Sequence, residues 1–569
     1  MSSEIVRIAA DWLDSLGQAF ASGDAETIVA LFQQDGWLRD LLTFSWDFRS
    51  LRGTDQIINY LSQYIPSASI SNVKLDRRTG LEPSLVSLGP DLDNILEASF
   101  TFENASGSGR GMIYLKQDAT QQWKAFIVFM TLDELRGLEE QDHESGLYGG
   151  HTITYQEVQA RRVAEVESDP QVLIVGAGQT GLQVAARFKQ MGIRAIVIDK
   201  NSRVGDNWRV RYIMFPHHTR ALLLYAPFPS TWPRFTPRDK LANWLEQYAT
   251  SQDLVIWTDS EIVPTPSYDP GTKRWGVRVR RGDTEYLLHP IDIVIATGTL
   301  GDPLVPLISG QDTFVGDIMH SSRFPGGQVF TGRRVLVVGA GNTSADLCQD
   351  LVHHGAASVT MVQRSSSVVV SDKYMAGFFE GRWPEGVPYE ISDFRTAAMP
   401  LGQTREILQR LQQYALEYDS TMHEDLRKQG LSLSNGPDGA GLIWTLFSRL
   451  GGIDVGCAAL IADGKVEVKQ GVEVARFDKN GILFSDGTET EADAVLFATG
   501  YHNMRDTIRK IFGDIIDKTS PVWGLDDEYE LRGFYRPSGQ EGLWYAAGDF
   551  SHARYHSKHL VSGHSYPSG

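Results

Sequence analysis

The sequence predicts an α/β protein built around two strand–turn–helix units, with a small α+β module in front of them. Residues 176–181 read GAGQTG and residues 339–344 read GAGNTS. An apolar run typical of a buried parallel strand precedes each of them, at residues 172–175 and 335–338, and a stretch with helical periodicity follows. Strand, glycine turn and helix in this order are typical of Rossmann-like domains.

Residues 1–135 have a different pattern. Helical periodicity opens this segment, and Thr54 after Gly53 marks the start of a further helix. Strand-like runs follow at residues 95–102, 111–116 and 123–131. Helices followed by antiparallel strands indicate an α+β domain with a curled sheet, and this segment resembles the cone-shaped NTF2-like (SnoaL-like) domains. Some SnoaL-like proteins are enzymes with an Asp or His base. No histidine precedes His143, so Asp40 and Asp47 are the candidate bases here.

Residues 136–169 are charged and contain glycine, which is typical of a linker. We expect the N-terminal module to act as a dimerisation surface or as a lid. We also expect a chain that starts near Ser168 to bind the ligand of the first glycine turn without this module.

The glycine turns have the arrangement that a dinucleotide requires. The first glycine permits the tight turn, and the second lets backbone N–H groups approach a pyrophosphate. The third lets helix and strand pack closely, with the helix N-terminus facing the anion. Ser344 replaces the third glycine in the second copy, and it is still a small residue. The alternative for both is a turn that joins strand to helix without a ligand.

The two units end in opposite charges. The strand at residues 195–198 leads into Asp199, whereas the strand at residues 359–362 leads through Gln363 to Arg364. A carboxylate at this place accepts the hydroxyls of a ribose, and a guanidinium suits a 2′-phosphate. The sequence therefore predicts FAD at the first unit and NADPH at the second.

A repeated strand motif indicates how the units are connected. Residues 293–298 (IVIATG) lie before the second glycine turn and residues 495–500 (VLFATG) lie after it. A further strand at residues 542–546 leads to Asp549, which either binds the ribityl chain of a flavin or belongs to a simple turn. The sequence thus predicts tandem, nested Rossmann-like domains. The expected division is 170–325 for the first part of the FAD domain, 326–490 for the NADPH domain and 491–569 for the C-terminal part of the FAD domain.

Composition excludes several other classes. A net charge of −18 argues against nucleic acid or an anionic membrane as a partner. The two cysteines, Cys348 and Cys457, provide neither a disulfide scaffold nor the adjacent pair that a disulfide reductase needs. The sequence has no run of 18 apolar residues and no apolar segment of a signal peptide. We expect a cytoplasmic enzyme without a metal.

Residues 314–324 fit the pattern F-x-G-x-x-x-H-x-x-x-[F/Y]. Together with residues 205–208 (GDNW), 363–365 (QRS) and 498–501 (ATGY), they make residues 170–560 resemble the flavin-containing monooxygenases, class B flavoproteins. The indole-pyruvate-monooxygenase-like members are the most similar. The resemblance implies that NADPH reduces FAD and that a C4a-(hydro)peroxyflavin passes one oxygen atom from O2 to a small organic substrate.

Two alternatives to this function are kept. Phe324 followed by Pro325 lies between this fingerprint and that of the Baeyer–Villiger monooxygenases, which oxygenate ketones. An NADPH oxidase-like flavoprotein, or one that binds nucleotides without catalysis, is the alternative from another class.

The resemblance also implies the site residues. His218 would lie beside the flavin, where it is either a catalytic group or a packing residue. His320 would lie near the junction of the domains, where it is either a catalytic group or a residue that fixes the linker. The expected cofactor ligands are Gly176, Gly178, Thr180, Gly181, Asp199, Lys200, Gly205, Trp208, Thr297, Gly298, Asp549, Gly339, Gly341, Asn342, Thr343, Ser344, Arg364 and Ser365. The expected partners are O2, a small-molecule substrate and a second copy bound through the N-terminal module.

Overall fold

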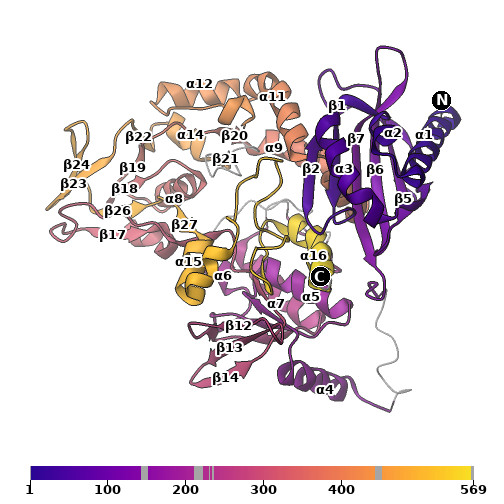
Figure 1. The fold of residues 1–569 in the computed structure, drawn as a ribbon. Coiled ribbons are helices and arrows are strands. Elements are labelled where there is room, and N and C mark those ends of the chain that lie inside the picture. Colours follow the sequence, from indigo (N-terminus) through magenta and orange to yellow (C-terminus); the bar gives the residue numbers. More distant parts are fainter. Residues whose placement is uncertain are drawn as a thin grey trace.

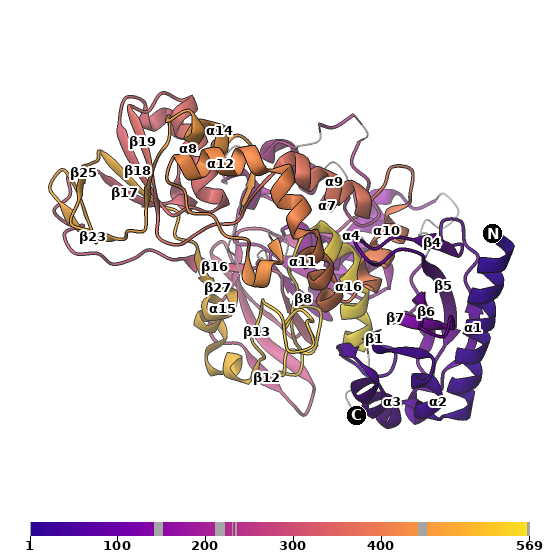
Figure 2. The ribbon, with the colours of Figure 1, turned by 90° about the horizontal axis from the view of Figure 1, so that it is seen from above.

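The computed structural model describes residues 2–141, 152–210, 222–229, 231–233, 236–441 and 452–565. The N-terminal module and the sheet that carries the second glycine turn lie at opposite ends of the molecule (Figures 1 and 2). The sheet of the first glycine turn and the C-terminal helix α16 (Phe550–Ser565) lie between them.

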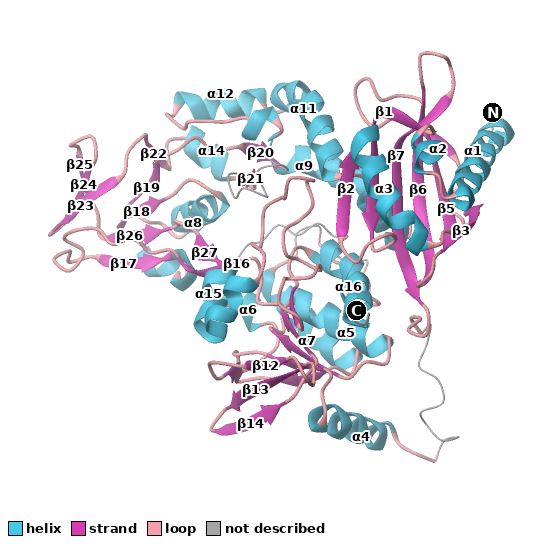
Figure 3. Ribbon diagram, in the orientation of Figure 1, coloured by secondary structure: helices cyan, strands magenta, loops and turns pink. Residues whose placement is uncertain are grey.

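The N-terminal module is an α+β domain, as predicted. Its sheet has the order β2-β1-β7-β6-β5-β3, with β4 paired to β5, and neighbouring strands are antiparallel except β1 and β7. Helices α2 and α3 lie across one face of the sheet (Figure 3). The elements are α1 (Ser2–Ser22), α2 (Ala25–Val29), β1 (Phe32–Leu41), β2 (Phe48–Arg52), α3 (Thr54–Ala68), β3 (Ser71–Leu75), β4 (Ser84–Val86), β5 (Ile95–Glu103), β6 (Gly107–Gln117) and β7 (Trp123–Leu135).

Both faces of this sheet are buried, because side chains alternate along each strand. One set packs with the module's own helices and includes Leu38, Ile113 and Val128. Their strand neighbours join the core that also contains the first parallel sheet, and they include Trp37, Met112 and Ile127. The module and the first parallel sheet therefore share one core, and the binding of FAD by a chain that starts near Ser168 stays a prediction.

The first glycine turn belongs to a five-stranded parallel sheet with the order β10-β9-β8-β15-β28. Strand β28 comes from the C-terminal part of the chain and pairs with β15, so the predicted nesting is confirmed. The elements are β8 (Val172–Val175), α5 (Gln179–Gln190), β9 (Ala195–Ile198), α6 (Asp206–Arg209), α7 (Arg238–Ser251), β10 (Val255–Trp257), β15 (Asp292–Ile295) and β28 (Leu543–Tyr545). A smaller sheet packs beside it, made of β11 (Ser260–Ile262), β12 (Ser267–Asp269), β13 (Arg274–Arg281) and β14 (Thr284–Leu288).

The second glycine turn belongs to another five-stranded parallel sheet, with the order β17-β26-β18-β19-β22. Its elements are β17 (Asp317–His320), β18 (Arg334–Val338), α8 (Asn342–His353), β19 (Ser358–Gln363), β22 (Glu467–Gln470) and β26 (Ala494–Phe497). Three short strands extend from it, namely β23 (Val474–Asp478), β24 (Gly481–Phe484) and β25 (Glu489–Glu491).

The predicted boundaries at residues 325 and 491 are wrong, because β17 and β26 lie in the second sheet. Each Ala-Thr-Gly segment closes the glycine turn of its own sheet. A Cβ atom on Gly176 would lie 2.7 Å from the Ala296 carbonyl oxygen, and one on Gly339 would lie 2.5 Å from that of Ala498. The two segments are therefore equivalent parts of a repeat.

A helical insertion connects the second sheet to the N-terminal module. It lies between β20 (Val369–Ser371) and β21 (Gly452–Asp454) and contains α9 (Asp372–Arg382), α10 (Tyr389–Ala398), α11 (Leu401–Tyr418) and α12 (Ser420–Lys428). Helix α11 lies beside the module (Figures 1 and 2), where Trp37 Nε1 donates to Gln403 Oε1 at 3.1 Å.

The remaining elements include α14 (Cys457–Ala462), the pair β16 (Leu300–Pro303) and β27 (Tyr501–Asn503), and α15 (Met504–Phe512). The linker predicted for residues 136–169 is wrong from Tyr155 onward, where α4 (Tyr155–Ser168) begins with Thr154 as its capping residue. No helix in the described ranges is long and apolar enough to cross a membrane.

Candidate active site

The first glycine turn leaves the N-terminus of α5 open for an anion. Gly178 is the N-cap residue and gives no side-chain cap, so the first N–H groups of the helix have no side-chain acceptor there. Gly176 has a φ of +110°, which favours glycine. A Cβ atom on Gly181 would lie 1.8 Å from the Gly176 carbonyl oxygen, so the helix approaches the turn as closely as the backbone allows. This cradle fits a pyrophosphate.

Replacing Gly181 by alanine should abolish FAD binding and destabilise the fold by about 3 kcal/mol or more, because no rotamer removes a Cβ clash with a backbone oxygen. The flavin content of the purified protein and its thermal unfolding measure this. Ser344→Ala is the matched control, since the equivalent position of the second turn already holds a Cβ atom. Retention of FAD by Gly181→Ala at the wild-type level would contradict the expectation.

Asp199 lies at the end of β9, against the same turn. Its Oδ2 accepts from Ala177 N at 2.6 Å, and its Oδ1 accepts from Asn201 N at 2.8 Å. Oδ1 also accepts from Asn201 Nδ2 at 2.8 Å, whereas Oδ2 keeps a lone pair for a ribose hydroxyl, which fits the predicted role. Lys200, the next residue, is exposed.

The structure divides the other residues predicted for this cofactor into two groups. Gly205 and Trp208 serve the packing of α6 on α7, since a Cβ on Gly205 would lie 2.5 Å from the Ala242 carbonyl oxygen and Trp208 is buried. Thr180 is also buried. Thr297 and Gly298 follow β15 at the mouth of the turn, and a Cβ on Gly298 would meet no atom within 4 Å.

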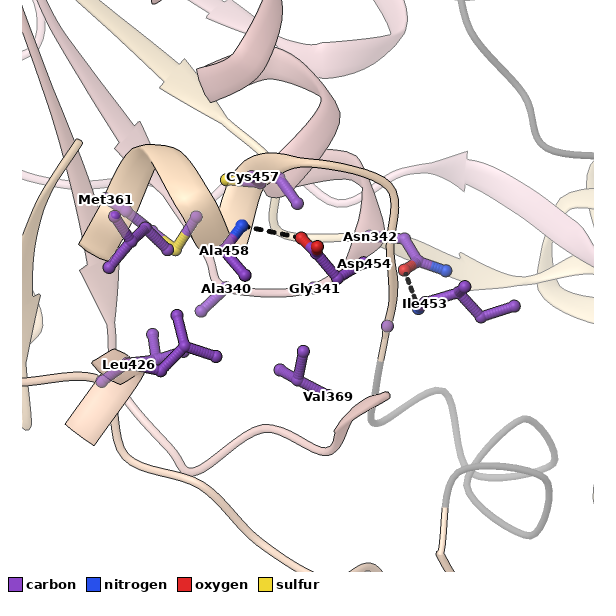
Figure 4. Close-up of a pocket in the computed structure, with 14 residues that line it drawn as sticks. Ala340, Gly341, Asn342, Met361, Val369, Leu426, Ile453, Asp454, Cys457 and Ala458 are labelled. Carbon is purple, nitrogen blue, oxygen red and sulfur yellow. Dashed lines mark hydrogen bonds between the residues drawn. The ribbon is translucent and has the colours of Figure 1, made fainter. Parts of the chain in front are cut away.

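The second glycine turn is also open at the N-terminus of α8. Gly341 is the N-cap residue without a side-chain cap, and a Cβ atom there would meet no atom within 4 Å. The turn borders a pocket of about 410 Å³ (Figure 4). Asn342 Oδ1 accepts from Ile453 N at 2.8 Å, so this side chain also holds β21 against the turn. Thr343 follows in the first turn of α8, and Ser344 is fully buried against Gly339.

Arg364 lies beyond β19 with its side chain 74% exposed. Its Nη1 is 3.3 Å from Glu473 Oε1, and the Glu473 side chain is 61% exposed. Exposed pairs of this kind contribute at most about 1 kcal/mol, so a phosphate can replace the carboxylate. Ser365 is exposed next to it. This arrangement fits a 2′-phosphate.

His320 lies at the end of β17 and is buried. Its Nδ1 accepts from Ser322 N at 3.1 Å, and its Nε2 is 3.0 Å from the Gly500 carbonyl oxygen. Burial lowers the pKa of His320 and outweighs the opposite effect of Gly500, so the ring is neutral. With both nitrogens engaged, the contacts favour fixing the junction over proton transfer. His218, the other catalytic candidate, lies outside the described residues.

Asp549 lies at the N-terminus of α16. Its Oδ1 accepts from Ser551 Oγ at 2.7 Å and from His552 N at 2.9 Å, and His552 Nδ1 is also at 2.9 Å. Burial tends to raise the pKa of Asp549, but His552 and these hydrogen bonds outweigh it and hold the pKa well below its usual range. The carboxylate is therefore ionised and oriented at the edge of a cavity of about 1160 Å³.

Aromatic side chains and two arginines, Arg39 and Arg382, line this cavity, and Arg39 is paired with Glu530. The guanidinium of Arg382, from the last turn of α9, lies 4.4 Å from the centre of the Phe378 ring. Burial lowers the pKa of Arg382 to about 10, against the opposing charge of Asp549. Within the described ranges, the structure gives this guanidinium no hydrogen bond and no ion pair. The aromatic lining comes from distant segments, namely Phe48, Phe378, Phe379, Trp383, Phe534, Tyr535 and Tyr555.

No sequence motif indicates the residues that the insertion and the N-terminal module contribute to this cavity. Arg382, Phe378 and Phe48 belong to no motif, and they meet only because α9 and β2 pack beside α16. Asp40 and Asp47, the candidate bases of the module, are not among the cavity-lining residues. Asp40 is fully buried, with its pKa raised to about 6 by burial, and Tyr60 and backbone N–H groups donate to it.

The cysteines do not form a redox pair beside the cavity. Cys348 on α8 and Cys457 on α14 are free thiols in the apolar core below the second sheet. Burial raises the pKa of Cys457 to about 12 and that of Cys348 well above its ordinary value. A reactive thiolate needs the opposite shift.

Comparison with known proteins places this arrangement among flavoproteins. Residues 173–376 match the family described as pyridine nucleotide-disulphide oxidoreductase. Indole-3-pyruvate monooxygenase YUCCA1 of Oryza sativa subsp. japonica is 28% identical over 362 residues, which cover 61% of this chain and 81% of the relative.

Two solved structures share the fold. An oxidized steroid monooxygenase bound to NADP is 18% identical with a TM-score of 0.50, over 69% of this chain and 84% of that chain. A cyclohexanone monooxygenase bound to ε-caprolactone is 17% identical with a TM-score of 0.50, over 69% of this chain and 87% of that chain.

Proposed function

We propose that this chain is a flavin-containing monooxygenase, which uses NADPH and FAD to insert one atom of O2 into a small organic substrate. The second oxygen atom leaves as water, with two electrons from NADPH. Two open glycine turns that end in opposite charges, Asp199 and Arg364, support this pair of cofactors.

The chain's own residues bind and orient the two dinucleotides. The N-terminus of α5 would bind the FAD pyrophosphate, with Asp199 at the ribose and Asp549 at the ribityl chain. The N-terminus of α8 and Arg364 would bind NADPH. Bound FAD supplies the redox and oxygen chemistry, so the protein needs no separate acid–base pair for it.

We propose that the substrate is an aromatic 2-oxo acid, because Arg382 lies in the cavity. A guanidinium that has no hydrogen bond or ion pair within the described residues and lies among aromatic rings suits a planar ligand with one negative charge. The relatives named indole-3-pyruvate monooxygenases act on a molecule of this class. Oxygenation at the 2-oxo carbon would release CO2 and leave a carboxylic acid one carbon shorter.

Turnover under ¹⁸O2 tests this function. Holoenzyme with NADPH and indole-3-pyruvate should release CO2 and place one ¹⁸O atom in the shortened acid and one in water, per NADPH oxidised. Hydrogen peroxide as the only oxygen product would indicate an oxidase. Conversion of cyclohexanone to its lactone, with no reaction of the 2-oxo acid, would favour the Baeyer–Villiger alternative.

Arg364→Glu should lower kcat/KM for NADPH by about 10- to 100-fold and change that for NADH little, because a repulsive charge replaces a donor to the 2′-phosphate. Steady-state kinetics with both coenzymes measure this preference. Arg476→Glu, at an exposed arginine of β23, is the matched control. If the ratio of kcat/KM for NADPH to kcat/KM for NADH is unchanged, Arg364 does not bind the 2′-phosphate.

We also propose a cytoplasmic location, since the two free thiols suit a reducing compartment. A homodimer through the N-terminal module would have to use its helices or sheet edges, because both sheet faces are buried within one chain.

A further inference from the structure

We infer that the N-terminal module is a working part of the oxygenation site, because it holds the segment of residues 526–536, which forms one wall of the cavity beside Asp549. We call this segment the wall loop. The inference rests on the proposed function, and it assigns the module a positioning role.

Charged pairs connect the module to the wall loop at three places. In each pair, a side chain of the first two strands, or of the turn between them, meets a side chain of the loop with two hydrogen bonds. The pairs are Arg39 with Glu530 at 2.7 and 2.8 Å, Arg49 with Glu528 at 2.8 and 2.5 Å, and Asp47 with Arg536 at 2.6 and 2.9 Å. Bidentate pairs of this kind fix orientation as well as distance.

The wall loop reaches the cavity between these pairs. Glu530, Leu531, Phe534 and Tyr535 line the cavity, and the paired residues Glu528 and Arg536 lie on either side of this stretch. A shift of any pair would therefore move the cavity surface.

The module also lines the cavity directly. Phe48, at the start of β2, lies 5.3 Å from the His556 ring and 5.4 Å from the His559 ring, measured between centroids. Both histidines belong to α16, the helix that begins beside Asp549, and His559 Nε2 is 2.9 Å from Thr131 Oγ1 of β7. Arg39 and Phe48 both line the cavity, so the module sets its size and its exclusion of water.

Exclusion of water matters for a monooxygenase, because water that enters the site releases the activated oxygen as hydrogen peroxide. A loosened wall loop should leave NADPH oxidation intact and divert electrons from product to peroxide. A smaller side chain at position 48 should admit larger substrates.

The first test uses the partly exposed pair, Arg49 with Glu528, whose reversal the fold tolerates best. Arg49→Glu should raise the hydrogen peroxide formed per NADPH at least threefold, with flavin content retained. The exchanged pair Arg49→Glu with Glu528→Arg should restore most of the coupling. Arg7→Glu, which reverses an exposed charge of α1, is the control and should change nothing.

The second test measures substrate size with holoenzyme. Phe48→Ala should raise the ratio of kcat/KM for indole-3-pyruvate over phenylpyruvate, and Phe48→Trp should lower it. A variant that is merely unstable would lower kcat/KM for both substrates by the same factor and leave their ratio unchanged. Unchanged coupling in Arg49→Glu, or a shift of the size ratio in the same direction in both Phe48 variants, would overturn the inference.

Failure of the proposed function remains distinguishable. If the wild-type enzyme oxygenates neither acid, the proposed function fails, and the same variants are compared by phenylpyruvate binding to oxidised holoenzyme, read from flavin absorbance. Weaker binding in Arg49→Glu, restored by the exchange, would support the positioning role. Equal binding in all variants would overturn it.

Discussion

Replacing Arg39 by methionine should destabilise the holoenzyme by about 3–5 kcal/mol, because it leaves the buried Glu530 carboxylate without its cation. The two side chains are 6% and 2% exposed, and Arg39 also donates to the Met399 carbonyl at 3.3 Å. Denaturant unfolding, followed by flavin fluorescence and circular dichroism, measures the loss. Few other single substitutions in this chain should cost as much.

Two variants separate the buried charge from lost packing. Arg39→Met with Glu530→Leu removes both charges and should recover most of the stability, since an apolar replacement of a buried pair is often neutral. Arg203→Met breaks an ion pair with Glu246 whose side chains are 52% and 37% exposed, and should cost about 1 kcal/mol or less. Equal losses for Arg39→Met and Arg203→Met would show that the buried pair adds no stability.

The glycine turns could be predicted from the sequence because their geometry is local. Close approach of Gly181 to Gly176 and of Gly339 to Ala498 depends on residue size at fixed positions, and the sequence records that directly. The nested connection could also be predicted from the sequence, because the second nucleotide-binding unit interrupts the first.

The assignment of each strand to its sheet did not follow from the sequence. Residues 293–298 and 495–500 carry the same motif, and nothing local states which strand each will pair with. The structure pairs β15 with β8 and β26 with β18. The repeat therefore has two complete copies. The order of the segments along the chain had instead predicted that both strands lie in the sheet of the FAD domain.

The cavity was beyond prediction for another reason. Phe48, Arg382, Tyr535 and Asp549 come from four segments of the chain and meet only in the folded protein. Only Asp549 follows a recognisable strand and turn. An arginine in a helix is usually a solvated surface residue, so Arg382 could not be singled out without its place in the cavity.

Replacing Arg382 by leucine should lower kcat/KM for an aromatic 2-oxo acid by about 30- to 150-fold, which corresponds to about 2–3 kcal/mol for a lost charge-assisted contact. Flavin content and the KM for NADPH should stay at wild-type values, because Arg382 is not among the described neighbours of either glycine turn. The effect should appear mainly in KM for the acid, as expected for an interaction made equally in the ground and transition states.

An uncharged analogue is the decisive control for Arg382. Indole-3-acetaldehyde has the aromatic ring and a carbonyl but no carboxylate. Its inhibition constant against indole-3-pyruvate turnover should therefore be the same in wild type and Arg382→Leu. Arg382→Lys keeps the charge without the planar fork and should recover part of the loss. If Arg382→Leu weakens the aldehyde as much as the acid, the side chain only packs against Phe378. The proposed anionic substrate would then lack its cation, because Arg39, the other arginine that lines the cavity, is already paired with Glu530.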